Sequence, residues 1–275
     1  DRNPWLSKSF YQKHWTIITW CSCILPIILT FAWIADLGQD YNDYSGGGDF
    51  ETTGEAYGAL NWHPTLMVLG YTFFGGNALL GFRVAPLKQR YHRKLFHGAF
   101  HLCAFSVCAG GLGMMILFKE NTANAQFYTL HAWIGICVFA LYIIQWIGGF
   151  CIFLFPGPRM FSAKVRGAFH PFHTLIGALL YASALAAMLT GIIDRMWIYN
   201  AYNNPDVDLY GKQFVISNVL GLSIIFNAIC IFSHFHPLLK PDDPFESVQT
   251  IETTPTENFR ESRYSAQMAQ YGTLE

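Results

Sequence analysis

The sequence is poor in charge, and that shortage excludes most soluble folds. Of its 275 residues only 13% are Asp, Glu, Lys or Arg, about half the fraction of an average soluble domain, whereas 52% are hydrophobic and 17% aromatic. The formal net charge is -1, so the overall balance gives no indication of nucleic-acid binding. We therefore predict an all-α membrane protein without a nucleic-acid partner.

The sequence also lacks a cysteine framework. Its seven cysteines lie within apolar runs, with no C-x-x-C pair and no regular spacing, so we interpret them as small apolar residues rather than disulfide partners or zinc ligands. The chain begins with Asp1 rather than Met and shows no cleavable signal pattern. We expect the first apolar run to act as a retained signal anchor.

Six long runs contain no charged residue, and each exceeds the ~20 residues that a transmembrane helix needs. They are residues 15–35, 56–82, 95–118, 121–158, 167–193 and 213–239. Within the fourth run, residues 128–153 suffice for one crossing. We predict a six-helix transmembrane domain over residues 14–240, an N-terminal tail over 1–13 and a polar, disordered C-terminal tail over 241–275.

The positive charges lie on alternate sides of the predicted helices. Of the 17 Lys and Arg residues, 14 lie in the N-terminal tail, in the loops after the second and fourth helices, and in the C-terminal tail. By the positive-inside rule these segments, and hence both termini, are cytosolic. The opposite side carries only Lys119, Arg195 and Lys212, together with an acidic first loop.

No predicted helix contains an internal carboxylate, since Asp36 and Asp194 lie at helix ends. Metal-ion and proton-coupled transporters usually place carboxylates at mid-membrane depth. Electron transfer between cofactors needs no such polar pathway. A scaffold of the four-pass adhesion type would leave the histidines below unexplained and would normally have cysteines in its outer loops, where this chain has none.

Histidines lie where predicted helices enter the membrane. His63 opens the second helix and His131 lies near the start of the fourth, and since both helices run inward these two share the outer depth. The third and fifth helices run outward and begin with histidines at the inner depth. Two histidine pairs, each on parallel helices, suit the bis-imidazole ligation of two planar macrocycles inside a helix bundle.

The spacing alone does not choose between neighbouring histidines at the inner depth. Either His97 or His101 could pair with either His170 or His173. The H-x-x-x-H spacing of His97 and His101 also places two imidazoles on one helical face, as a zinc site requires. The main alternative is therefore a histidine-lined transition-metal transporter. The remaining histidines, His14, His92, His234 and His236, are interpreted as interfacial residues.

Glycines lie on the same helical faces as the candidate histidines and would leave room for a flat cofactor. Gly135 and Gly177 follow His131 and His173 by one turn, and Gly70 follows His63 by two. A spacing of 18 residues is five full turns, or ~27 Å. At that spacing Gly81, Gly149 and Gly191 return to the faces of His63, His131 and His173, at the depth of the opposite pair.

Four motifs together resemble the cytochrome b561 family of ascorbate-dependent transmembrane oxidoreductases. They are Asn61-Trp62-His63-Pro64, Lys94-Leu95-Phe96-His97-Gly98-Ala99-Phe100-His101, Tyr128-Thr129-Leu130-His131-Ala132-Trp133, and Pro171-Phe172-His173 followed by Gly177. Equal gaps of 34 residues separate His63 from His97 and His97 from His131. The resemblance covers roughly residues 56–241, the second to the sixth predicted helix.

This resemblance implies a homodimer of six-helix chains, each holding two b-type haems in a four-helix core formed by helices 2 to 5. The implied ligands are His63 and His131 for the outer haem, and His97 and His173 for the cytosolic haem. His101 and His170 then become pocket residues. The implied cytosolic docking site for ascorbate comprises Lys94, Arg166 and Arg90.

The implied function is electron transfer from cytosolic ascorbate to monodehydroascorbate or a ferric chelate on the other side of the membrane. The family often has an outer-loop histidine after the third helix, where this chain reads Phe118-Lys119-Glu120-Asn121. We expect Lys119 to attract an anion there instead. The tail pattern Tyr271-Gly-Thr-Leu274 resembles a sorting signal, so the expected locations are secretory vesicles, endosomes or lysosomes, and the plasma membrane.

Overall fold

The computed structural model describes residues 8–37, 57–84, 87, 89–122, 125–202 and 211–235, and every regular element among them is helical. The longer elements are α1 (Lys8–Leu37), α2 (Tyr57–Val68), α4 (Arg90–Asn121), α5 (Leu130–Gly149), α6 (Ala163–Tyr202) and α7 (Lys212–Ser233). The shorter ones are η2 (Leu69–Gly75), α3 (Gly76–Leu80), η3 (Phe150–Leu154) and η4 (Gly157–Arg159). The predicted tail 241–275 lies outside the described residues.

Among the described residues, five helices are long and apolar enough to cross a membrane. Their spans are Tyr11–Ala35, Arg90–Asn121, Leu130–Leu154, Ala163–Trp197 and Lys212–Ser233. The remaining predicted helix, 56–82, corresponds to α2, the π-helical segment η2 and α3, which follow one another directly. The junction residues Val68, Gly75 and Gly76 all keep right-handed helical backbone angles.

Several helices extend beyond the uncharged runs that predicted them. α1 begins at Lys8 rather than at residue 15, and α4 begins at Arg90 rather than at residue 95. Lys and Arg are good helix formers, so a helix continues through the polar residues that flank its apolar part. An uncharged run in the sequence shows which part of a helix lipid can surround. It does not show at which residues the helix begins and ends.

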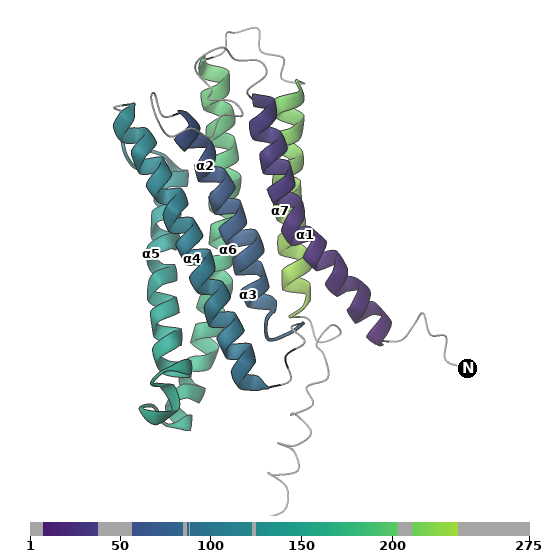
Figure 1. The fold of residues 1–275 in the computed structure, drawn as a ribbon, viewed down its shortest axis with the longest axis vertical. Coiled ribbons are helices and arrows are strands. Elements are labelled where there is room, and N and C mark those ends of the chain that lie inside the picture. Colours follow the sequence, from purple (N-terminus) through teal and green to yellow (C-terminus); the bar gives the residue numbers. More distant parts are fainter. Residues whose placement is uncertain are drawn as a thin grey trace, which may run out of the picture. The chain divides into compact units, whose positions relative to one another are not determined.

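The helices run side by side, successive ones in opposite directions (Figure 1). α1 packs against α7, α2 against α4, α5 against both α4 and α6, and α6 against α7. The starts of α2 and α5 therefore lie at the same end of the bundle as the last turns of α4 and α6. This arrangement brings His63 and His131 to one end, and the start of α4 and His173 to the other.

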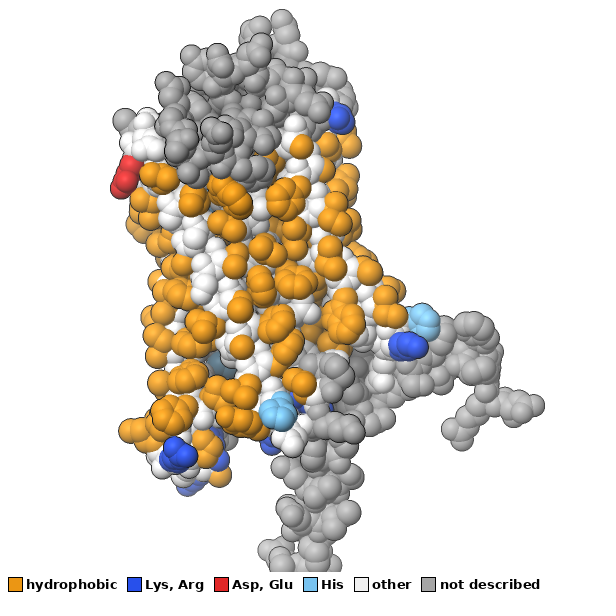
Figure 2. Space-filling view, in the orientation of Figure 1, with side chains coloured by type: hydrophobic (Ala, Val, Ile, Leu, Met, Phe, Trp, Pro, Cys, Tyr) orange, Lys and Arg blue, Asp and Glu red, His pale blue; other side chains and the backbone are white. Residues whose placement is uncertain are grey.

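The two ends differ in charge. One end contains the described residues between α3 and α4 and the segment 155–162, and it carries most of the described cations. They are Arg83, Arg90, Arg93, Lys94, Arg159, Lys164 and Arg166. We name this the basic end and the other the opposite end. Figure 2 shows a broad hydrophobic surface between the ends, with Lys and Arg side chains gathered at the lower edge of the view.

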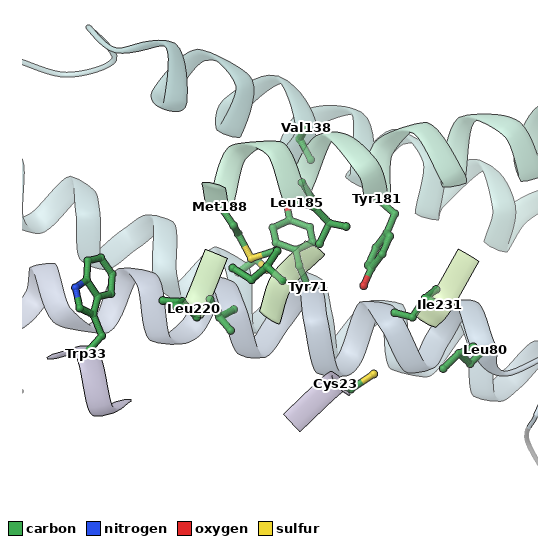
Figure 3. Packing of buried hydrophobic residues seen from close by; sticks show 14 of the residues in the cluster. Cys23, Trp33, Tyr71, Leu80, Val138, Tyr181, Leu185, Met188, Leu220 and Ile231 are labelled. Carbon is green, nitrogen blue, oxygen red and sulfur yellow. The ribbon is translucent and has the colours of Figure 1, made fainter. Parts of the chain in front are cut away.

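The apolar core lies where α1, α6 and α7 meet the α2–η2–α3 segment. In Figure 3, Tyr71 lies among Leu185, Met188 and Leu220, and Trp33 lies at one edge of the cluster. All five of these side chains are buried. This packing fixes α1 and α7 against the helices that carry the histidines.

Polar side chains link α1, α6 and α7 inside this core. The Asn227 side chain is fully buried, its amide nitrogen donates to Ser22 Oγ at 3.2 Å, and its Oδ1 accepts from the Tyr181 hydroxyl at 2.9 Å. Further along, Thr19 Oγ1 and His234 Nε2 are hydrogen-bonded at 2.9 Å. In an apolar medium such bonds hold helices in register because the alternative is an unpaired polar group.

Replacing Asn227 by alanine is expected to destabilise the bundle. The change leaves the Tyr181 hydroxyl and Ser22 without this buried partner, which costs about 1–3 kcal/mol of unfolding free energy. The measurement is thermal unfolding in detergent of Asn227→Ala beside Asn218→Ala, which alters an exposed asparagine of the same helix. Equal melting temperatures in the two variants would contradict a stabilising role for the network.

Candidate functional site

His63 and His131 face each other at the opposite end of the bundle. The ring centroids are 5.9 Å apart and the ring planes are nearly perpendicular, at 84°. His63 Nδ1 is hydrogen-bonded to the carbonyl oxygen of Gly111 in α4 at 2.9 Å. His131 Nδ1 is hydrogen-bonded to the carbonyl oxygen of Ala187 in α6 at 2.8 Å. Both rings are thus held by helices other than their own.

These two histidines line a cavity of about 210 Å³. Its wall is mostly apolar and is built from α1, α2, α4, α5, α6 and α7 together with the segment before α5. Gly135 and Gly191 belong to this wall, as do the aromatic rings of Tyr71 and Phe139. A mostly apolar cavity with two convergent imidazoles is the expected form of a cofactor site in a helix bundle.

His97 and His173 form the second pair, toward the basic end. Their ring centroids are 6.2 Å apart, at 71°. His97 Nδ1 is hydrogen-bonded to the Ala78 carbonyl oxygen in α3 at 2.8 Å. The Gln145 amide nitrogen lies 3.0 Å from His173 Nδ1 and donates to the His173 carbonyl oxygen at 2.6 Å. Here too the supporting groups come from neighbouring helices.

The hydrogen bonds determine which ring nitrogen is available in three of the four histidines. A carbonyl oxygen only accepts, so Nδ1 of His63, His97 and His131 carries the proton and donates it. In a neutral imidazole Nε2 then holds the free lone pair, which is the form that binds a metal. A hydrogen bond on the other ring nitrogen is also what usually orients metal-bound histidines.

Two glycines lie against histidines of the neighbouring helix, at the depth that their 18-residue spacing predicts. A Cβ atom on Gly149 would approach Cε1 of His173 to 2.7 Å, and one on Gly191 would approach Cε1 of His131 to the same distance. Real Cβ atoms do not come so close, so only glycine leaves room for these rings. α5 and α6 are uninterrupted α-helices over these spacings, so five full turns return the glycine to the predicted face.

Gly81 of the second predicted helix has a different neighbour. A Cβ on Gly81 would meet the Phe96 ring at 2.7 Å rather than a histidine ring. Between His63 and Gly81 lies the π-helical segment η2, whose wider turn shifts the helical phase. Gly70 also differs from expectation, since Cys108 of α4 packs against it and no room for a cofactor remains there.

The three predicted ascorbate-docking residues lie together at the basic end. Lys94 Nζ donates to the Phe153 carbonyl oxygen at 3.1 Å. Arg90 and Arg166 lie near enough for their positive charges to repel the Lys94 ammonium group. The Phe153 ring lies 5.3 Å from the His173 ring. Arg166 itself donates to the Phe161 carbonyl oxygen. A cluster of cations therefore lies beside the second histidine pair.

Aromatic side chains bridge the two pairs. The His101 ring lies 4.4 Å from the His97 ring, and His101 Nδ1 is hydrogen-bonded to the Tyr142 hydroxyl. The Tyr142 ring lies 5.9 Å from that of Tyr71, which lines the His63–His131 cavity. His101 thus lies in the pocket beside His97, whereas His170 is exposed.

The described residues support a zinc site at His97 and His101 less well than they support paired haem ligands. His97 and His101 are adjacent, but their Nδ1 atoms are bonded to Ala78 and Tyr142. Within the described ranges no three His, Cys, Asp or Glu side chains come together as metal ligands. Tetrahedral zinc sites normally take at least three such ligands from the protein.

Comparison with known proteins agrees with this geometry. The family description "Eukaryotic cytochrome b561" matches residues 62–199, which include all four paired histidines. A bovine transmembrane ascorbate-dependent reductase CYB561 is 32% identical over 199 residues, which is 72% of this chain and 72% of the relative. The chain belongs to the cytochrome b561 family.

Other relatives come from a second mammal and from a plant. The mouse transmembrane ascorbate-dependent reductase CYB561 is 32% identical over 176 residues, 63% of this chain and 67% of the relative. The maize ascorbate-specific transmembrane electron transporter 1 is 32% identical over 198 residues, 71% of this chain and 80% of the relative. Similarity thus extends beyond the animal members of the cytochrome b561 family.

Family membership implies that this cytochrome b561 chain binds haem b, and its residues fit that group. Each pair offers two imidazoles from different helices, and Gly149 and Gly191 remove the Cβ atoms that would push the rings aside. The wall of the His63–His131 cavity also contains a buried indole N–H, that of Trp33, without a hydrogen-bond partner. An unpaired donor in a cavity wall is consistent with a bound group that carries acceptors.

Sequence reasoning missed several residues of the site, among them Gln145, Tyr142 and Trp33. Gln145 is the single amide side chain between residues 130 and 154, and an isolated polar residue in a membrane helix indicates a specific partner. Tyr142 and Trp33 carry no comparable signal, because aromatic residues are common throughout this sequence. Only their positions in the bundle distinguish them.

A methyl group on Gly149 or Gly191, the two glycines that lie against a histidine ring, is expected to displace that histidine and lower the haem content. Gly149→Ala acts on His173 and Gly191→Ala on His131, so each should lower the amount of haem bound per polypeptide. Haem per polypeptide in purified protein is the measurement. Gly148→Ala is the control, because a Cβ there meets nothing within 4 Å. Full haem content in both Gly149→Ala and Gly191→Ala would contradict the claim that only glycine leaves room for the His173 and His131 rings.

Proposed function

We propose that this chain is a transmembrane oxidoreductase that carries electrons from cytosolic ascorbate, by way of two bound haems b, to an acceptor on the other side of the membrane. The observation that supports the proposal most is the presence of two histidine pairs at the two ends of one bundle. Donor and acceptor sites at opposite ends suit transmembrane electron transfer, which needs no polar pathway between its cofactors. The names of the relatives point to the same activity.

In this proposal His63 and His131 hold one haem, and His97 and His173 hold the other. Haem supplies a one-electron couple, and ligation by two histidines leaves no open position for oxygen. The Nδ1 bonds to Gly111, Ala78 and Ala187 direct Nε2 toward the ligand position. The aromatic bridge from His101 through Tyr142 to Tyr71 places polarisable side chains between the pairs.

We further propose that ascorbate docks at the basic end. Ascorbate is an anion, and Lys94, Arg166 and Arg90 form a cationic cluster next to the His97–His173 pair. A cationic site beside a low-dielectric bundle raises the local concentration of an anion and favours its binding. The positive-inside rule gives the same orientation, with the basic end and both termini in the cytosol.

Six membrane crossings follow if the α2–η2–α3 segment counts as one. It covers residues 57–80 without a break, long enough to span the hydrocarbon layer of ~30 Å. Homodimer formation and a location in secretory vesicles, endosomes or lysosomes, or the plasma membrane complete the proposal. The acceptor is monodehydroascorbate or a ferric chelate.

The deciding experiment is the visible absorbance spectrum of the detergent-purified chain when oxidised, with ascorbate and with dithionite, with haem quantified per polypeptide. We expect two low-spin b-type haems per chain, a large part of them reduced by ascorbate. A colourless protein that cannot be reconstituted with haem would overturn the proposal. The histidine-lined metal transporter would then be the remaining candidate, and zinc or iron flux the assay.

Removing one ligand of the basic-end pair is expected to remove one haem and the prompt reduction by ascorbate. His97→Ala and His173→Ala should each retain about half of the haem, because the other pair is intact. Haem content and stopped-flow reduction by ascorbate are the measurements. The control is His170→Ala, which alters an exposed histidine of α6, the helix that also carries His173. Retention of both haems in either ligand variant would exclude the assignment.

Neutralising Lys94 is expected to weaken the use of ascorbate without loss of haem. Lys94→Met keeps the length of the side chain but removes its charge, so the KM for ascorbate should rise severalfold while reduction by dithionite is unchanged. Lys164→Met is the matched control, since Lys164 is an exposed lysine at the same end. An unaltered KM in Lys94→Met would place ascorbate docking elsewhere.

A further inference from the structure

The four paired histidines differ in the group that faces Nδ1. In His63, His97 and His131 this group is a carbonyl oxygen of another helical segment. In His173 it is the side-chain amide nitrogen of Gln145 in α5, at 3.0 Å. A carbonyl oxygen accepts a hydrogen bond, whereas an amide nitrogen donates one. His173 therefore has a partner of the opposite kind at the ring nitrogen that orients its ring.

A second contact decides which end of the Gln145 amide faces the ring. The same nitrogen donates to the His173 carbonyl oxygen at 2.6 Å. If the amide were turned over in place, its oxygen would lie against that carbonyl oxygen, and two acceptors repel each other. The nitrogen thus donates to the ring as well as to the carbonyl group. In a neutral imidazole the proton of His173 then lies on Nε2.

A proton on Nε2 conflicts with iron binding by His173. A ligating imidazole uses the lone pair of Nε2, so the proton has to move to Nδ1, and the ring stays neutral in the exchange. Nδ1–H would then face the Gln145 nitrogen, one donor against another. Metal-bound histidines usually donate this N–H to an oxygen. The Gln145 amide supplies such an oxygen once it rotates and gives up its bond to the His173 carbonyl group.

The neighbouring glycines separate the rotating group from the fixed ring. A Cβ atom on Gly149 would approach His173 Cε1 to 2.7 Å, so the ring lies directly against the α5 backbone. A Cβ atom on Gly177, one turn after His173, would lie at an ordinary contact distance of 3.6 Å from Gln145 Nε2. Since Gly177 has no Cβ, no α6 side chain borders the amide at this position. The sequence predicted room for a flat cofactor beside Gly177, whereas the structure places the Gln145 amide there.

We propose that Gln145 is a positioning residue that sets how strongly His173 donates electrons to a bound haem iron, according to which end of its amide faces Nδ1. An oxygen that accepts from Nδ1–H makes the imidazole a stronger donor and stabilises ferric iron. For the other three histidines this oxygen belongs to the backbone, whereas for His173 a single substitution can remove it. The inference rests on the proposed function, because it takes His97 and His173 as the ligands of one haem.

The first test measures the midpoint potentials of both haems in Gln145→Leu and Gln145→Glu. Leucine has a similar size but no acceptor, so the potential of the haem at the basic end should rise. We expect a rise of about 60 mV, which is a tenfold change in the ratio of reduced to oxidised haem. Glutamate adds a negative charge to the acceptor, so the potential of the same haem should fall. The low-spin EPR signal of that haem should shift in both variants.

The haem assigned to His63 and His131 is the internal control. It is identified in His97→Ala, which is expected to keep that haem alone, and its potential should not differ between wild-type protein and the two Gln145 variants. An amide that only joins α5 to α6 would change the melting temperature without changing a potential. Unchanged potentials in both variants would therefore overturn the proposal, whatever happens to stability. Loss of the basic-end haem from Gln145→Leu alone would support it.

A second measurement needs no bound haem. Heteronuclear NMR of the full chain with isotope-labelled histidine distinguishes a protonated ring nitrogen from a bare one. In protein purified without haem, we expect a bare Nδ1 on His173 and a protonated Nδ1 on His63. The His173 signals are assigned by their loss in His173→Gln. A protonated Nδ1 on His173 would overturn the proposal. A wild-type chain that takes up no haem would contradict the proposed function instead, and this spectrum would still decide the role of the Gln145 nitrogen.

Discussion

Hydrogen bonds from imidazole Nδ1–H groups to helix carbonyl oxygens hold three of the four paired histidines. In each case the carbonyl belongs to a different helical segment: Gly111 lies in α4, Ala78 in α3 and Ala187 in α6. A carbonyl oxygen has two lone pairs, so it can accept from a ring while it also accepts from its own helix. The ring positions and the helix packing therefore depend on each other, and a shift of one helix would move a ring on its neighbour.

The close approach of these helices depends in turn on small residues. Gly149 and Gly191 let the rings of His173 and His131 lie directly against a helix backbone, and Gly70 lets Cys108 pack against η2. The polar contacts of Asn227 join α1 and α7 to α6 and so stabilise one side of the bundle. Inside a lipid bilayer there is no hydrophobic driving force for helices to associate. Close contacts and hydrogen bonds between the helices therefore stabilise the bundle.

The two ends of the bundle use positive charge differently. At the basic end Lys94, Arg90 and Arg166 lie near the helix starts, where a soluble anion can reach them from water. At the opposite end Lys119 and Arg195 lie in the wall of the cavity itself, and Lys119 is nearly buried. Charges within reach of water are screened by salt, whereas buried charges are screened much less. This contrast suits different ligands at the two ends.

Sequence reasoning predicted the all-helical membrane class, because an uncharged run of sufficient length can cross lipid only with its backbone bonds satisfied within a helix. It also placed Gly149 and Gly191 at the depth of the opposite histidine pair, because the turn of an α-helix is constant. It did not foresee that both glycines would lie against a histidine ring of the neighbouring helix, nor that the π-helical segment η2 would interrupt the helical period before Gly81. Helix ends were missed as well, because polar flanks extend a helix beyond its apolar part.

By itself, then, the sequence determined which segments are helical, which face of each helix carries the histidines and glycines, and which loops are basic. These properties are local and follow from composition and from the helical period. Only the tertiary structure decided that Gln145 supports His173, that Tyr142 joins His101 to Tyr71, and that Trp33 of α1 reaches the His63–His131 cavity. Those contacts join helices far apart in the chain, and their geometry depends on how the whole bundle packs rather than on any spacing within one helix.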